Sequence, residues 1–227
     1  MRIQLDFLAI LSEWPLLLTG VAWTLALTIA AVLVGTVLGT ACAWVRARGF
    51  GDALAPGWLK LAVSAYVELI RNTPFIVQLF FIFFGLPAAG YKLSAESASF
   101  IAMVINLAAY ATEIIRAGLE ATPKGQMEAA VSLALNRVQT FVWVVLPPAL
   151  KKVWPSLVSQ IIIVMLGSSV CGQISTQELS YAADLIQSRN FRSFEAFIVV
   201  GGIYLLLAVA LRHTLNWVGA RFVFGSR

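Results

Sequence analysis

Long runs of uncharged residues constrain this chain more than any other feature of its sequence. Trp14–Val45 contains no Asp, Glu, Lys or Arg, and a helix needs only about 20 apolar residues to cross the hydrocarbon core of a bilayer. Hydrophobic residues make up 60% of the 227 residues and charged residues 12%, about half of the ~25% that is usual in soluble domains. A soluble domain of this length could not bury so much apolar surface. The sequence therefore predicts a polytopic membrane protein and excludes a soluble enzyme, a disordered chain and a disulfide scaffold.

Five segments have the length and hydropathy of transmembrane helices, which predicts an all-α fold. Their approximate ranges are 18–45, 61–87, 97–116, 153–177 and 194–218. Residues 1–16 are too short for a sixth crossing, but Ile3, Phe7 and Ile10 recur there at helical spacing between polar residues. We interpret this segment as an amphipathic helix that lies on the membrane surface, with a frayed terminus as the alternative. Residues 218–227 would form a cytoplasmic tail.

The distribution of Lys and Arg predicts the orientation in the membrane. Eleven of these residues fall in the loops 46–57 and 117–151, at the adjoining helix ends or in the C-terminal tail, and only four fall on the opposite side. Because cytoplasmic loops are enriched in Lys and Arg, we expect the N-terminus to lie outside and the C-terminus in the cytoplasm. The net charge of +5 fits basic loops at an anionic membrane surface better than nucleic-acid binding.

Residue counts exclude several kinds of catalytic or metal site. His213 is the only histidine, so neither a histidine-rich metal site nor a Ser-His-Asp triad can be built. Cys42 and Cys171 both lie in apolar runs, where we expect small packing residues rather than a disulfide. The phosphate-binding pattern G-x-x-x-x-G-K-S/T is absent from the sequence, so this chain cannot cradle ATP in such a loop. We therefore expect no enzymatic activity.

The longest predicted cytoplasmic loop, 117–151, has the pattern of two short amphipathic helices. Thr122-Pro123 favours a helix start, with the threonine as the cap and the proline in the first turn. Apolar residues at 127, 130, 131 and 134 form one face, and those at 138, 141, 142 and 145 form a second. We expect the turn between the helices at Asn136 and the end of the second helix at Pro147-Pro148. Such a helix must bury its face on the membrane, on the protein's own spans or in a groove of a partner.

This loop resembles the EAA loop of the permease subunits of ABC importers. The family pattern is E-A-A, three residues, G, nine residues, I-x-L-P, and this chain has Glu128-Ala129-Ala130, Ala134 and Val144-x-Leu146-Pro147 at the same spacing. Ala134 stands where glycine is usual, and Val144 stands where isoleucine is usual. If the family glycine has a positive φ, alanine costs roughly 1 kcal/mol there, and we expect Asn136 to take over the turn.

Two further stretches resemble one branch of this family, the permeases of binding-protein-dependent importers for polar amino acids. Residues 68–74 (ELIRNTP), 78–81 (QLFF) and 84–87 (FGLP) are similar to the branch pattern E-x-x-R-G-T-P, Q-L-F-F, F-G-L-P, with Asn72 in place of glycine. Residues 109–118 (AYATEIIRAG) and Gly125-Gln126 also fit that branch. The resemblance covers about residues 20–217.

The resemblance implies a MetI-like permease domain over residues 20–217, which works in a pair with an identical or homologous permease subunit. Two ATP-binding subunits would bind ATP and magnesium on the cytoplasmic face of a bacterial cytoplasmic membrane, and an extracytoplasmic solute-binding protein would deliver the substrate. No cofactor is expected in this chain. The loop would dock on an ATP-binding subunit, and the residues assigned to this coupling are Gly125, Gln126, Glu128, Ala129, Ala130, Ala134, Leu146 and Pro147.

Charged and polar residues inside the spans are candidates for the translocation pathway or its gate, because intramembrane charges usually face a bundle interior or a water-filled path. Glu68 and Arg71 are three residues apart and would share a helix face, as would Glu113 and Arg116. Structural charge neutralisation is the alternative for both pairs. Pro74 is expected to kink the second span. The candidates are Glu68, Arg71, Asn72, Thr73, Glu113, Ser168, Ser169 and Gln173.

The fourth span departs from the amino-acid branch at residues 166–170. These read L-G-S-S-V where K-D/N-T-S-L is usual, and this loss of charge weakens the transfer of substrate identity from the family. Small polar residues also serve helix packing in membranes, which is the alternative for the two serines.

A self-contained channel or secondary transporter is the alternative function. Such a protein often contains internal repeats with broken helices, and we find no convincing repeat in this sequence. An intramembrane enzyme is less favoured still, because no span carries an arranged nucleophile and base.

Overall fold

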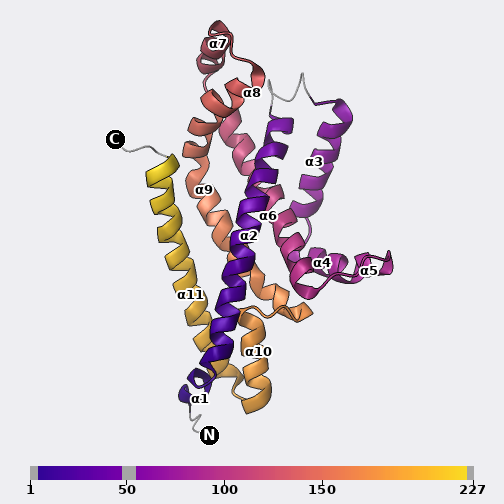
Figure 1. Ribbon diagram of the computed structural model, residues 1–227, viewed down its shortest axis with the longest axis vertical. Helices are drawn as coiled ribbons and strands as arrows, with labels where there is room; N and C mark the ends of the chain where they lie inside the picture. The colour runs from indigo at the N-terminus through magenta and orange to yellow at the C-terminus, as the bar shows by residue number, and fades with distance from the viewer. Residues whose placement is uncertain (1–4, 48–54, 224–227) are drawn as a thin grey trace. The chain divides into compact units, whose positions relative to one another are not determined.

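The computed structural model describes residues 5–47 and 55–223, and all regular structure in these ranges is helical, as predicted (Figure 1). Among the elements, η2, η3 and η5 are π-helical, and η4 is a 3-10 helix. The elements in chain order are α1 (Leu8–Leu11), α2 (Trp14–Arg46), α3 (Gly57–Arg71), α4 (Phe75–Phe80), η2 (Phe81–Gly85), α5 (Leu86–Ala88), α6 (Ala95–Glu120), α7 (Lys124–Ser132), α8 (Arg137–Gln139), η3 (Thr140–Val145), α9 (Leu146–Gly167), η4 (Ser168–Ile174), α10 (Leu179–Asn190), α11 (Ser193–Val218) and η5 (Gly219–Val223).

Four helical segments in the described residues are long and apolar enough to cross a membrane: Trp14–Arg46, Ala95–Glu120, Arg137–Ile174 and Ser193–Val223. A fifth crossing is present if α3 and the segment Phe75–Ala88 form one span, although the two are bent by 113° at the break between them. The first, third and fifth predicted spans coincide closely with α2, α6 and α11. The second and fourth differ from the prediction, and both differences have local causes.

The predicted second span is not one helix, because residues 72–74 separate α3 from α4. Pro74 has no N–H group and disfavours a helical conformation for the residue before it. The side chains of Asn72 and Thr73 donate hydrogen bonds, both of 2.8 Å, to the carbonyl oxygens of Glu68 and Leu69 in the last turn of α3. The carbonyl of Glu68 also accepts from the N–H of Asn72, so the side chains supplement the hydrogen bonds at a helix end. The kink expected at Pro74 is a complete break of the helix.

The predicted fourth span and the second loop helix form one continuous helical segment, from Arg137 to Ile174. The expectation that Pro147-Pro148 ends the loop helix is therefore wrong. α9 begins at Leu146, directly after the π-helical turn η3, so both prolines lie inside the continuous segment and not at its end. Such π-helical turns occur mostly inside longer helices. The helix of the fourth span thus begins before residue 153.

Both ends of the chain differ in detail from the sequence prediction. The helix expected over residues 1–16 is interrupted, because α1 is a single turn and the residues Ser12-Glu13 form a turn before α2. Ile10 is fully buried against other protein side chains. At the other end, η5 continues the helix of α11 to Val223 into the predicted tail. Residues 1–4 and 224–227 of these two predicted segments lie outside the described residues, as do residues 48–54 of the first predicted loop.

Contacts divide the chain into two compact units, and each of the long helices α2, α6, α9 and α11 contributes a part to both. Unit 1 comprises Met1–Ala31, Pro74–Val104 and Ile162–Leu211, and unit 2 comprises Val32–Thr73, Ile105–Ile161 and Arg212–Arg227.

The apolar core of unit 1 joins α1 and the first half of α2 to α10 and the first part of α11. Its buried members are Ile10, Leu17, Leu179, Ala182, Ala183, Ile186, Ala196 and Val200. The core of unit 2 joins the end of α2 and the end of α6 to η3 and the first half of α9. Its buried members are Ala43, Ala47, Ala111, Ile115, Leu119, Phe141, Val145, Ala149, Val153 and Leu157.

Candidate functional site

The predicted docking loop forms α7, a tight turn and α8, which continues into η3; residues 122–145 are called the elbow below. Pro123 takes the N-cap position of α7 with an extended backbone, at φ −60° and ψ 137°. Thr122 does not cap the helix as predicted, because its hydroxyl donates backwards to the carbonyl oxygen of Gly118 at 3.5 Å. The start of the helix was predicted to within two residues, although the capping residue was wrong.

The turn of the elbow is centred on Ala134, which has a φ of 55°. This left-handed conformation costs a residue with a Cβ about 1 kcal/mol relative to glycine. Asn136 has a φ of −71° and caps α8. Its side-chain oxygen accepts from the N–H of Gln139 at 2.9 Å, and the Gln139 side chain accepts in return from the N–H of Asn136 at 2.9 Å. The prediction that Asn136 takes over the left-handed turn is therefore wrong.

The inner side of the elbow is fixed to the core of unit 2. Ala130 is 1% exposed, and Phe141 and Val145 are members of the core cluster. The ring of Phe141 lies 5.8 Å from that of Trp44 at the end of α2. Behind the elbow, a Cβ on Gly118 would lie 2.8 Å from Cγ1 of Val153, so α6 and α9 approach each other there as closely as their backbones allow. The elbow is thus packed against the core of unit 2 along its inner side.

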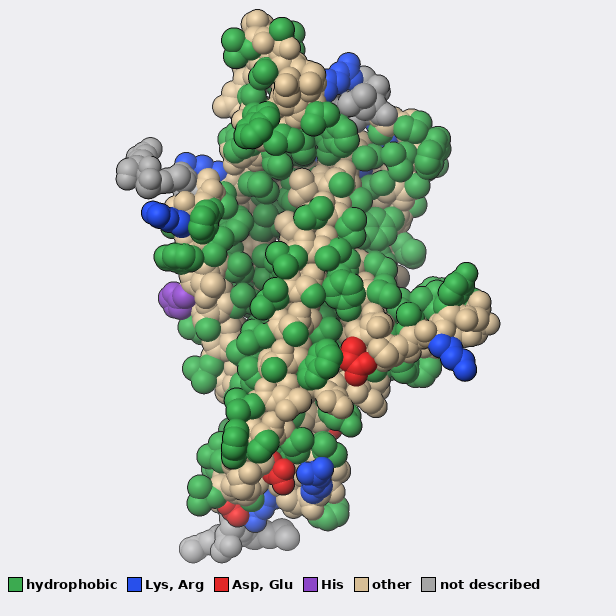
Figure 2. Space-filling view, in the orientation of Figure 1, with side chains coloured by type: hydrophobic (Ala, Val, Ile, Leu, Met, Phe, Trp, Pro, Cys, Tyr) green, Lys and Arg blue, Asp and Glu red, His purple; other side chains and the backbone are tan. Residues whose placement is uncertain are grey.

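The outer side of the elbow carries large apolar side chains that are mostly exposed (Figure 2). Val131, Leu133 and Trp143 are 72%, 73% and 75% exposed. The apolar face predicted for the first helix is therefore split, because Ala130 points inward whereas Val131 and Ala134 are exposed. Among the other predicted coupling residues, Leu146 is half-buried, and those that are exposed are Gly125, Gln126, Glu128, Ala129 and Pro147.

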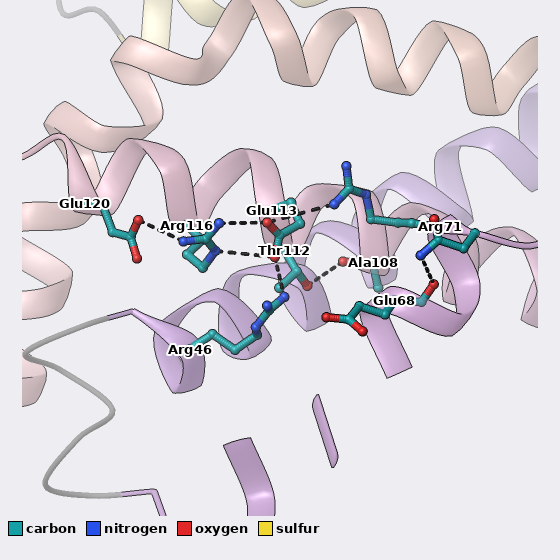
Figure 3. A network of polar contacts seen from close by, with 9 residues as sticks. Arg46, Glu68, Arg71, Ala108, Thr112, Glu113, Arg116 and Glu120 are labelled. Atoms are coloured by element: carbon teal, nitrogen blue, oxygen red, sulfur yellow. Dashed lines mark hydrogen bonds and ion pairs between the residues drawn. The ribbon is translucent and has the colours of Figure 1, made fainter. Parts of the chain in front are cut away.

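Three arginines from three different helices gather around one carboxylate in unit 2 (Figure 3). Glu113 on α6 forms ion pairs with Arg46 at the end of α2 and with Arg116, whose Nη2 lies 2.8 Å from Oε2 of Glu113. Arg116 also contacts Glu120 at 2.8 Å. The Glu113 side chain is only 18% exposed, so these charges interact in a partly desolvated environment. The predicted pairing of Glu113 with Arg116 is confirmed.

Arg71 is the most loosely held member of this cluster. Its Nη1 lies 3.9 Å from Oε2 of Glu113, and its side chain is 42% exposed. Its guanidinium also lies 5.5 Å from the centre of the Tyr110 ring, a distance at which a cation is attracted by the face of the ring. The three-residue spacing suggested that Arg71 pairs with Glu68 on the same helix. Arg71 instead pairs with Glu113 on another helix. Among the described residues, Glu68 is exposed and forms no ion pair.

The predicted pathway residues of the fourth span lie in unit 1, on the 3-10 helix η4. Ser168 is fully buried, and its hydroxyl donates to the carbonyl oxygen of Met165 at 2.6 Å. Ser169 is half-buried and Gln173 is exposed. η4 contacts α4 and α10. Within residues 5–47 and 55–223, no group of His, Cys, Asp and Glu could hold a metal ion.

Sequence reasoning missed two members of these sites. Arg46 was used only to predict the orientation in the membrane, although its position directly after an uncharged run marks it as a charge that needs a partner near the membrane. Tyr110 was quoted within the family pattern, but no sequence signal places its ring beside Arg71.

Known proteins resemble this chain over most of its length. A family model described as "Binding-protein-dependent transport system inner membrane component" matches residues 35–223. The probable glutamine ABC transporter permease protein GlnM of Bacillus subtilis (strain 168) is 35% identical over 209 residues, which cover 92% of this chain and 94% of that protein.

Two solved structures have a similar fold. The crystal structure of an amino acid ABC transporter with histidines matches with a TM-score of 0.84 and 34% identity, over 97% of this chain and 100% of that one. An inward-facing structure of the MetNI methionine ABC transporter matches with a TM-score of 0.70 and 25% identity, over 92% of this chain and 94% of that one. The predicted MetI-like fold is therefore confirmed. This chain belongs to the family of inner membrane components of binding-protein-dependent transport systems.

Proposed function

We propose that this chain is the permease subunit of an ATP-driven importer for polar amino acids in a bacterial cytoplasmic membrane. The substrate class is supported by the glutamine permease and the amino acid transporter that it resembles. The chain forms half of the translocation pathway and pairs with an identical or homologous permease subunit. The excess of Lys and Arg on one side puts the elbow and the C-terminus in the cytoplasm.

The observation that carries this proposal is the two-sided elbow. Its inner side is packed into the core of unit 2, whereas Val131, Leu133 and Trp143 are exposed on its outer side. Exposed apolar side chains on a packed element beyond the membrane core favour contact with another protein. Glu128 adds an exposed charge on the same helix, which can fix the register of the contact. The partner that fits is an ATP-binding subunit, and two copies serve the two permease subunits.

The division of labour between subunits follows from the residues of this chain. The sequence contains no phosphate-binding P-loop, so ATP and magnesium are bound by the partner subunit and no cofactor is held here. A solute-binding protein delivers the substrate on the opposite side of the membrane. The proposed pathway side chains lie at the break after α3 and in η4. At the break after α3 they are Glu68, Arg71, Asn72 and Thr73, with Glu113 paired to Arg71; in η4 they are Ser168, Ser169 and Gln173.

Co-purification with the ATP-binding subunit tests the docking role. Leu133→Asp places an unpaired carboxylate in the proposed contact, which costs ~2 kcal/mol or more when it is buried. We expect at least a tenfold loss of co-purified ATP-binding subunit and a matching loss of uptake. Glu128→Arg is a second variant with a reversed charge at an exposed position, and it should weaken the same complex.

Tyr91→Asp is the matched control, because Tyr91 is 70% exposed and lies in the loop after α5, outside the elbow. It should leave the complex intact. Full assembly and uptake with Leu133→Asp would overturn the docking role. Ion-coupled or passive uptake by the purified chain alone would instead favour a self-contained transporter.

A further inference from the structure

A second carboxylate, Glu178, lies fully buried in unit 1 between η4 and α10. Its 0% exposure is unusual for a glutamate, because burying a charge is costly unless hydrogen bonds or an opposite charge compensate for it. No ion pair involves Glu178 among the described residues, so its partners are neutral groups. The docking and pathway roles described above do not use this residue.

Neutral donors surround both oxygens of Glu178. Oε1 accepts from the N–H of Tyr181 at 2.8 Å, and Oε2 accepts from the N–H of Ser180 at 2.9 Å. The hydroxyl of Tyr204 on α11 also donates to Oε2, at 2.5 Å. The next N–H group of this helix start, that of Leu179, donates to the hydroxyl oxygen of Thr24 at 3.2 Å. Glu178 thus caps α10 with its carboxylate at the positive end of the helix dipole and joins that helix to α11.

The same carboxylate lies close to the backbone of η4 at Gly172. A Cβ on Gly172 would lie 2.6 Å from Oε1 of Glu178 and 3.1 Å from the backbone nitrogen of Tyr181. Glycine is therefore needed in η4 to let the carboxylate and the start of α10 approach so closely. Just beyond η4, the hydroxyls of Thr176 and Ser99 lie 2.7 Å apart in a buried hydrogen bond. Burial raises the pKa of Glu178 above its ordinary value, which agrees with a carboxylate compensated only by neutral groups.

We propose that Glu178 is a positioning residue that sets the place of η4, and with it Ser169 and Gln173, by holding α10 and α11 against that 3-10 helix. The proposal rests on the proposed function, in which η4 lines the translocation pathway. A 3-10 helix is held weakly by its own hydrogen bonds, so the contacts behind it determine where its side chains lie. Glu178 acts through this contact and touches no substrate.

The first experiment measures the position of η4 without transport. Gln173 is replaced by cysteine in a Cys42→Ser, Cys171→Ala background of the complete importer, and the rate of its modification by a water-soluble maleimide is followed. Tyr204→Phe keeps the ring and removes one donor to Glu178, together with the contacts of this hydroxyl with Ser168 and Ser180. Glu178→Gln leaves the Tyr204 hydroxyl in place and replaces an acceptor oxygen of residue 178 by a donor. We expect each to change the labelling rate at least threefold. Unchanged rates in both variants would overturn the proposal.

The second experiment measures uptake by the complete importer. Tyr204→Phe should raise the KM for uptake about tenfold, as expected for the loss of a hydrogen bond to a charged acceptor, with the ATPase activity unchanged. Tyr66→Phe is the matched control, because the Tyr66 hydroxyl donates to the carbonyl oxygen of Ile105 at 2.6 Å in unit 2. It also loses a short hydrogen bond of a tyrosine hydroxyl, in this case to a neutral carbonyl, and should leave both the KM and the labelling rate unchanged.

Equal effects of Tyr204→Phe and Tyr66→Phe on both readouts would mean that Glu178 only stabilises the fold, which would overturn the proposal. A change in labelling without a change in KM would overturn the link between η4 and the pathway. Failure of the unmodified importer to take up any amino acid would instead contradict the proposed function, and the labelling rates would still report whether Glu178 positions η4.

Discussion

Glu113 and Glu178 are two carboxylates that the two units of this chain accommodate in opposite ways. Glu113 in unit 2 is 18% exposed and is surrounded by three arginines. Glu178 in unit 1 is fully buried and is surrounded by backbone N–H groups and one hydroxyl. The first carboxylate is compensated by opposite charge and the second by neutral hydrogen-bond donors. The difference shows that an acidic residue in an apolar chain need not have a basic partner.

The two environments respond differently when they are disturbed. Removing the charge of Glu113 leaves three guanidinium groups close together without their shared partner. Removing the charge of Glu178 leaves only neutral groups with imperfect hydrogen bonds. Coulomb interactions in the first cluster extend over several residues and are screened by salt where they are exposed, whereas the bonds in the second are short and directional.

The largest effect is expected for Glu113→Gln. The change removes the shared partner of Arg46, Arg71 and Arg116, and the loss of one partner from a buried ion pair costs roughly 3 kcal/mol. We expect the free energy of unfolding of the importer in mixed micelles to fall by about this amount. Chemical denaturation followed by tryptophan fluorescence measures it.

Glu120→Gln is the control for this prediction, because among the residues that the structure describes this carboxylate pairs only with Arg116. A loss below ~1 kcal/mol is expected, as for partly exposed pairs. Equal losses for the two variants would contradict the view that Glu113 is the centre of the cluster.

A smaller effect is expected for Gly172→Ala, which tests how closely Glu178 and the backbone of η4 are packed. The new Cβ would lie 2.6 Å from Oε1 of Glu178, and overpacking of this kind typically costs about 1–3 kcal/mol. Gly201→Ala in α11 is the control, because a Cβ there would meet nothing within 4 Å. That change should instead stabilise the helix by up to ~1 kcal/mol.

The unfolding midpoints of the two glycine variants should therefore move in opposite directions. A stable Gly172→Ala variant with an unchanged maleimide-labelling rate on η4 would mean that the carboxylate moves aside freely. The contrast between a cluster held by shared charge and a site held by short contacts with neutral groups would then fail.

The sequence predicted the parts of this fold that depend on hydropathy and on spacing along one helix. α2, α6 and α11 follow from uncharged runs, and Glu113 with Arg116 follows from a spacing of three residues on α6. The elbow was located because its motif spacing is local. These features require no knowledge of which helices are neighbours.

The features that the sequence did not predict depend on contacts between distant segments. Arg46 reaches Glu113 across 67 positions of the chain, and Tyr204 reaches Glu178 across 26. Ala134 keeps the left-handed turn despite its Cβ, because α7 and η3 are both fixed to the same core, and this packing outweighs a local preference of about 1 kcal/mol. Pro147-Pro148 failed as a stop signal because the π-helical turn η3 leads directly into α9, and the helix continues through both prolines.

The smallest effect is expected for Arg71→Gln, and it distinguishes the two environments through salt. Arg71 is 42% exposed and lies 3.9 Å from Glu113, so its loss should cost only about 0.5 kcal/mol at low salt. Raising NaCl from ~0.05 to ~0.5 M should shrink this cost further, because the Debye length falls to a few ångströms.

Arg116→Gln, which removes contacts of 2.8 Å to two carboxylates, should cost more, and the cost should persist in salt because these groups are less exposed. Tyr204→Phe should show a loss that does not depend on salt, since its bond to Glu178 is buried. Unfolding midpoints at the two salt concentrations measure all three variants. A salt-insensitive Arg71→Gln loss as large as that of Arg116→Gln would mean that Arg71 is a full member of the cluster, and its assignment as the loosely held, pathway-facing arginine would be wrong.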